Sequence, residues 1–170
     1  GVPTVVLINQ GSASASQIVS GCLQAHNNSS PVVVVGERSF GKGSVQTVHP
    51  ISPTSRLKLT TQYYRLPPNV QQCEKGEQGS LVHKRIGAKK WGVDPDVLVK
   101  MTPQQATDAL ELRQAADVIP QDENGVLQPD SAKRPNINRL TTEGMDPQLE
   151  TALLILQARA MGDASGETRH

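Results

Sequence analysis

Two short apolar runs near the start of the chain predict buried β-strands. Residues 3–9 (PTVVLIN) and 31–35 (PVVVV) are continuous and rich in β-branched side chains, which is typical of strands covered on both faces. The stretch between them predicts a helix, because Ser14 and Gln17 match a capping box and apolar residues then recur at helical spacing. The recurring residues are Ile18, Val19, Cys22 and Leu23. This order indicates parallel strands joined by a right-handed crossover, with residues 3–9 as a central strand.

A hairpin is predicted next, after the loop sequence GERSFGKG. Residues 44–51 (SVQTVHPI) and 56–66 (RLKLTTQYYRL) alternate or are enriched in β-branched and aromatic side chains, with the turn sequence ISPTS between them. Residues 66–92 hold prolines, glycines and basic residues without periodicity, so we expect mostly loop there. Residues 96–100 (DVLVK) predict one more short strand.

The second half of the chain predicts two helices around a polar stretch. An N-cap, a proline and a capping box begin at Thr102 and predict a helix that ends before Pro120. Asp146 caps a last helix, for which Gly162 is the expected stop. The chain is therefore expected to be an α/β protein with a folded domain over 1–118, a linker or extended loop over 119–145, a closing helix over 146–162 and a disordered tail over 163–170.

Charge and composition exclude several classes of function. Lys and Arg total 17 against 16 Asp and Glu, so no net field would attract nucleic acid or an anionic membrane. The basic cluster KRIGAKKW is expected to be a solvated loop with Trp91 beneath it, and nucleic acid is not an expected partner. No pair of His, Cys, Asp or Glu forms a recognised ligand motif, so we expect no metal and no cofactor. No apolar run approaches the roughly 20 residues of a membrane-spanning helix, and no export signal is visible.

Ser14 has the surroundings of a nucleophile. A strand leads through small residues (GSASAS) into a helix start, where the turn is tight and backbone N–H groups are unpaired. The alternative is that Ser14 simply caps its helix. A serine also needs a base, and none of the four histidines stands in a sequence context that marks it.

Lys42 is the candidate base. It stands between Gly41 and Gly43 just after the second strand, where glycines let the backbone bend sharply. A lysine can accept the serine proton if burial lowers its pKa enough to leave the amine neutral. The alternative is a solvated loop lysine.

Together these segments resemble one family. GSASASQIVSG, GERSFGKGSVQ, LKLTTQYY and WGVDPDV resemble the carboxy-terminal processing (tail-specific) peptidases, and DPQLETALLIL resembles the segment that closes their catalytic domain. The resemblance implies Ser14 as nucleophile, Lys42 as general base, Gln46 as the residue that orients the lysine, and the backbone N–H of Ala15 as an oxyanion donor. It also implies a ββα core of the caseinolytic-protease or crotonase type, with the hairpin and the closing helix added to it.

The resemblance further implies partners and a compartment. Substrates would be proteins or peptides with free C-termini, cleaved near those ends, in the periplasm or another exported compartment. We expect the family's glycine-rich segment, which gives a second oxyanion donor, and its PDZ domain to lie upstream of Gly1, so residues 1–118 would be the C-terminal part of the catalytic domain. The isolated chain should then be a poor catalyst, and it could associate with itself through an exposed sheet edge.

Two other functions are weighed against a peptidase. Residues 36–42 match the phosphate-loop pattern G-x-x-x-x-G-K, but Gly43 replaces its Ser or Thr and the strand-like SVQTV replaces its helix. A binding or scaffold module of the same fold without activity is the second alternative. Retention of Ser14, Lys42 and Gln46 together argues against it.

Overall fold

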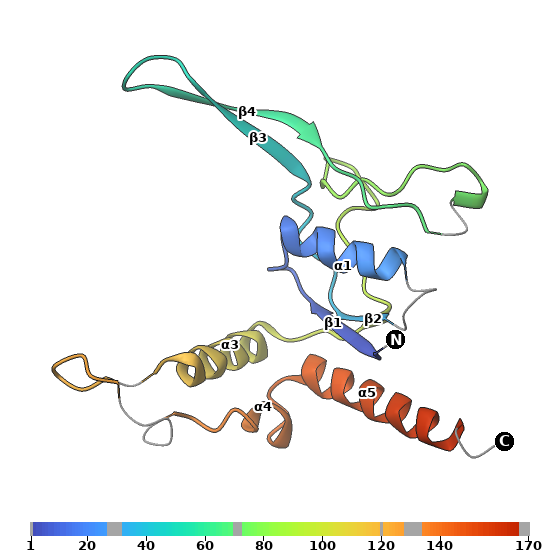
Figure 1. Ribbon diagram of the computed structural model, residues 1–170, viewed down its shortest axis with the longest axis vertical. Coiled ribbons are helices and arrows are strands. Elements are labelled where there is room, and N and C mark those ends of the chain that lie inside the picture. Colours follow the sequence, from blue (N-terminus) through green and yellow to red (C-terminus); the bar gives the residue numbers. More distant parts are fainter. Residues whose placement is uncertain (1, 27–31, 70–72, 120, 128–133, 167–170) are drawn as a thin grey trace.

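The computed structural model describes residues 2–26, 32–69, 73–119, 121–127 and 134–166, and for residues 163–166 it describes the backbone alone. The fold is mixed α/β, with a parallel sheet, a β-hairpin and several helices (Figure 1). This confirms the predicted α/β class. None of the helices in these ranges is both long enough and apolar enough to cross a membrane.

The sheet has three strands in the order β1-β2-β5. β1 (Thr4–Ile8) runs parallel to β2 (Val32–Gly36), and β2 runs parallel to β5 (Val97–Leu98). The predicted parallel pair is confirmed, but the central position predicted for residues 3–9 is wrong. β2 is central and its Val34 and Val35 are fully buried, whereas β1 pairs with β2 alone among the described residues and stays half-buried over most of its length. An apolar run indicates burial; it does not say which strand lies in the middle.

Helix α1 (Ala15–Ala25) follows β1 and contacts β2. Its buried residues are Gln17, Ser20 and Gly21. Ile18 and Val19 are 42% and 59% exposed, so the apolar spacing predicted a helix correctly without identifying its buried face. Glycine is needed at position 21 on this buried face because the neighbouring loop lies close to the helix. A Cβ at Gly21 would lie 2.4 Å from Leu66 Cδ2.

A hydrophobic core and helix α5 complete the body of the molecule around the sheet. The core beneath α1 is formed by Ile8, Val34 and Val93, with Val6 and Leu66 packed against them. Helix α5 (Pro147–Gly166) contacts both β1 and β2 from the side opposite α1 (Figure 1). The sheet is therefore covered by one helix on each face.

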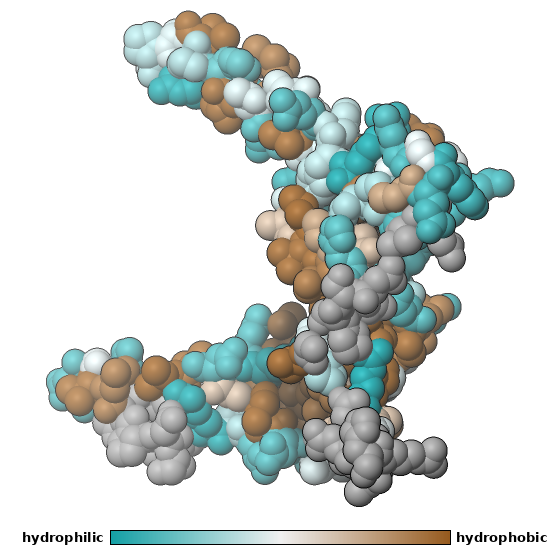
Figure 2. All heavy atoms as spheres, turned by 45° about the vertical axis from the view of Figure 1, so that its right-hand side comes forward, coloured by the Kyte–Doolittle hydropathy of each residue, from teal (hydrophilic) through white to brown (hydrophobic). Residues whose placement is uncertain are grey.

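The predicted hairpin is confirmed. β3 (Ser44–Pro50) and β4 (Arg56–Tyr63) pair in antiparallel fashion, with a register shift between Val45 and Gln46. The hairpin projects away from the parallel sheet (Figure 1), and nearly all of its residues are exposed. Figure 2 shows this arm and the helical end of the molecule on either side of an open hollow, with apolar side chains on the wall between them.

The helical end has a core of its own. Helix α3 (Pro103–Asp117) begins and ends as predicted, and α4 (Arg139–Thr142) is a single short turn. Ala109 and Leu112 of α3 pack with Leu140 of α4, and Met101, Met145 and Leu149 surround them. Asp146, 2% exposed, caps α5 through the N–H of Leu149 and pairs with Arg113.

Two boundaries in this half differ from the prediction. The stretch 119–145 was expected to be a linker or extended loop, and it contains the short helix α4, whose Leu140 is buried. α5 continues past Gly162 to Gly166, so Gly162 is not its stop and the expected tail over 163–170 begins as helix. Residues 128–133 of the expected linker and 167–170 of the expected tail lie outside the described residues.

Candidate functional site

Ser14 lies at a strained turn between β1 and α1. It is the N-cap of α1, with φ 56° and ψ −118°, and it is the one non-glycine residue with positive φ among those described. Such a conformation costs about 1–3 kcal/mol and persists only where its surroundings hold it. The side chain is exposed, and Ala15 is the first residue of α1, so its N–H belongs to the helix-start groups without an intrahelical partner.

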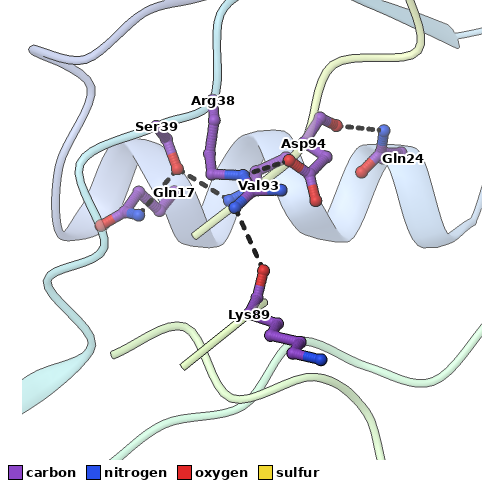
Figure 3. A network of polar contacts seen from close by, with 7 residues as sticks. All are labelled: Gln17, Gln24, Arg38, Ser39, Lys89, Val93 and Asp94. Carbon is purple, nitrogen blue, oxygen red and sulfur yellow. Dashed lines mark hydrogen bonds and ion pairs between the residues drawn. The ribbon is translucent and has the colours of Figure 1, made fainter. Parts of the chain in front are cut away.

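Gln17 joins the segment of Ser14 to the segment of Lys42. Its Oε1 accepts a hydrogen bond from the N–H of Ser14 at 2.9 Å and from the N–H of Lys42 at 3.0 Å. Its Nε2 donates to Ser39 Oγ at 2.8 Å, and that oxygen also accepts the N–H of Val93 at 2.7 Å (Figure 3). Gln17 is fully buried, so every polar atom of its amide is matched inside the protein.

The loop of Lys42 passes close to its neighbours at both flanking glycines. Gly41 has φ +94°, and a Cβ there would lie 2.5 Å from Trp91 Cδ1. At Gly43 a Cβ would lie 2.7 Å from the backbone nitrogen of His83. The sequence correctly indicated a special backbone here, but only the fold shows that the glycines also leave room for Trp91 and His83.

Tyr64 binds the other side of the same two backbone segments. Its hydroxyl donates to the carbonyl of Lys42 at 2.5 Å and to the carbonyl of Ser14 at 3.1 Å. Burial raises the pKa of Tyr64, and a smaller contribution from the side chain of Ser14 lowers it. Gln17 and Tyr64 together therefore hold the N–H and the C=O of both Ser14 and Lys42.

A cavity opens beside Lys42. Its volume is about 610 Å³, and its walls include Phe40, Trp91, Lys42, Arg38 and Lys84. Arg38 and Lys84 stack on the ring of Trp91, with their charged atoms 4.3 Å and 4.5 Å from its centroid. The expectation that Trp91 lies beneath basic side chains agrees with this geometry. The cavity combines apolar walls with positive charge.

The other predicted site residue lies on the hairpin. Gln46 is in β3 opposite Thr60, directly after the register shift, and is exposed. Its role in orienting Lys42 stays a prediction, as does proton transfer between Ser14 and Lys42. The loop that carries Lys42 leads into β3 and not into a helix, which removes the helix N-terminus that a phosphate loop requires.

Sequence reasoning missed two of the residues that organise this site. Gln17 was visible only as part of a capping box, and Tyr64 only as part of the segment LKLTTQYY. Their partners are far away in sequence: 25 residues separate Gln17 from Lys42, and 50 separate Tyr64 from Ser14. Local patterns carry no signal for such bonds.

The fold and the joined Ser14 and Lys42 segments define an α/β protein that presents a serine at a strand-to-helix turn beside a glycine-flanked lysine. The model of peptidase family S41 matches residues 1–99. The chain belongs to this family. The match includes Ser14, Lys42 and Gln46.

Several known proteins are similar to parts of the chain. The chain is 52% identical over 65 residues to the carboxy-terminal-processing protease of Bartonella bacilliformis, covering 38% of this chain and 14% of that protein. It is 34% identical over 116 residues to carboxy-terminal processing protease CtpB of Bacillus subtilis, covering 68% of this chain and 20% of that protein. A solved photosystem II D1 C-terminal processing protease is 32% identical with a TM-score of 0.43, covering 78% of this chain and 26% of that one. The chain thus covers between 14% and 26% of the length of these relatives.

Proposed function

We propose that this chain carries the nucleophile and the general base of a serine endopeptidase that cleaves protein substrates near their C-termini. The observation that carries the proposal is the pairing of the Ser14 and Lys42 backbones through one buried side chain, Gln17. A serine and its base must stay within hydrogen-bond reach of each other for proton transfer. A shared buried acceptor, set between the two residues, supports such a pair.

The proposed chemistry follows the acyl-enzyme route. The neutral amine of Lys42 takes the proton of Ser14 Oγ while that oxygen attacks the scissile carbonyl, and the N–H of Ala15 donates to the oxyanion. As the intermediate collapses, the Lys42 ammonium gives its proton to the departing amine. Water then attacks the ester with Lys42 again as base, which releases the acid and restores Ser14. Gln46 is proposed to orient the lysine.

The broader setting is proposed from the relatives, whose names describe carboxy-terminal processing proteases. Proteins or peptides with free C-termini are the proposed substrates, a PDZ domain in the parent protein their proposed binding module, and an exported compartment the proposed location. The core is proposed to be of the caseinolytic-protease or crotonase type.

The test uses residues 1–170 and any longer natural form that contains them, each assayed on a peptide with a free apolar C-terminus. Ser14→Ala should abolish turnover. Ser12→Ala and Ser16→Ala are matched controls, because each removes a hydroxyl that bonds a nearby backbone group: Ser12 Oγ accepts the N–H of Asn9 and Ser16 Oγ donates to the carbonyl of Ala13. Both controls should keep a measurable rate. Turnover retained in Ser14→Ala would refute the proposal and favour a scaffold module or another nucleophile.

A further inference from the structure

We infer that Tyr64 is a positioning residue for the proposed Ser14–Lys42 pair, and that its hydroxyl sets the distance between nucleophile and base. This inference rests on the proposed function. Its basis is one hydroxyl that donates to two carbonyls, those of Lys42 and Ser14. A phenol has a single proton, so the two bonds share it, and the 2.5 Å contact to Lys42 is the shorter.

Ser14 depends on such contacts because its backbone is strained. Its φ of 56° is sparsely populated for a residue with a Cβ. On the N–H side it is held by Gln17 Oε1. On the carbonyl side it is held within α1 by the N–H groups of Gln17 and Ile18, and by Tyr64. Tyr64 is the one donor to this carbonyl from outside α1 within the described part of the chain.

Tyr64 is itself fixed to the segment that carries the base. Its N–H donates to the carbonyl of Gly43 at 3.0 Å, one residue beyond Lys42, and the preceding Tyr63 pairs with Ser44 at the root of the hairpin. Tyr64 and the loop of Lys42 therefore form one hydrogen-bonded unit. The hydroxyl bond to Ser14 joins this unit to the start of α1, in parallel with Gln17.

Removing the hydroxyl should loosen the pair without altering contacts to substrate. Tyr64→Phe keeps the ring and leaves both carbonyls without this donor. A shift of about 1 Å between reacting groups can cost a hundredfold in rate, so kcat should fall about ten- to a hundredfold while KM stays within about twofold. Such a split is expected of a residue that acts on geometry rather than on substrate binding.

The neighbouring tyrosine offers a matched control. Tyr63 is 47% exposed and its ring packs on His83 with centroids 4.8 Å apart, so Tyr63→Phe removes a hydroxyl of the same kind from the adjacent residue. Both variants would be made in the longest natural form that contains the chain, with thermal unfolding measured beside kcat and KM. Tyr63→Phe should retain full turnover.

A pH profile separates positioning from simple folding support. A fluorinated tyrosine at position 64, with a phenol that ionises near neutral pH, keeps the ring and its oxygen but loses its proton as pH rises. Relative to the natural protein, its kcat should be close to normal at low pH and should fall as the phenol ionises, with no such fall for the same replacement at Tyr63. This variant also serves if Tyr64→Phe fails to fold.

The outcomes distinguish the two proposals. Loss of turnover in Ser14→Ala together with loss of kcat in Tyr64→Phe supports both. Loss in Ser14→Ala with full kcat in Tyr64→Phe, or with a pH profile of the fluorinated protein parallel to the natural one, overturns the positioning role alone. Full turnover in Ser14→Ala overturns both, because no pair is then left to position.

Discussion

Replacing Gln17 by methionine should destabilise the protein by about 2–4 kcal/mol. Methionine has similar size and flexibility, so it leaves little cavity, but its thioether sulfur is only a weak acceptor for the N–H groups of Ser14 and Lys42. A fully buried donor left unsatisfied costs about 1–3 kcal/mol. For the two donors these costs sum to about 2–6 kcal/mol. We expect a loss in the lower half of that range, because Ser14 and Lys42 are exposed and water can reach part of their surface.

The assay is urea unfolding of the 170-residue chain, with a matched substitution on the same helix. Gln24 donates to Asp94 O and Asp96 Oδ1 in exposed positions (Figure 3 shows the bond to Asp94), so Gln24→Met should cost about 1 kcal/mol or less. For a chain of this size the Gln17 variant should also melt about 4–16 °C lower than the natural protein. Equal unfolding free energies for the two variants would refute the assigned importance of the buried amide.

Three further predictions concern the same region. Lys42→Arg should be as inactive as Lys42→Ala, because arginine stays protonated and cannot accept the serine proton; steady-state rates of both variants test this. Gly41→Ala should destabilise the protein by about 2 kcal/mol more than Gly76→Ala, since both glycines have positive φ but a Cβ meets Trp91 only at Gly41 and open space at Gly76; equal melting temperatures would contradict it. Burial raises the pKa of Tyr64 above 10.0, so its contribution to stability is complete below pH 10 and is lost as pH rises through the raised value. The stability gap between the natural protein and Tyr64→Phe should therefore shrink above pH 10 in urea unfolding, and a gap that widens would reverse the sign of this reasoning.

The sequence alone determined the local elements and the family. Apolar runs and helical spacing located β1, β2, α1, the hairpin and α3 to within a few residues, because strand and helix periods and capping boxes act over one or two turns of chain. The segments around Ser14 and Lys42 resembled one peptidase family, and the match to family S41 over residues 1–99 confirmed it.

Tertiary structure decided which residues organise the site. The spacing in α1 pointed to an apolar face, yet the helix buries Gln17, whose amide finds matched partners on segments that the sequence places far away. The same holds for Tyr64, 50 residues from Ser14. A local pattern records what a residue can offer as donor, acceptor or apolar surface. Which partner that residue bonds or packs against depends on how β2 and the hairpin bring the loop of Lys42 against the start of α1. That packing exists only in the folded chain.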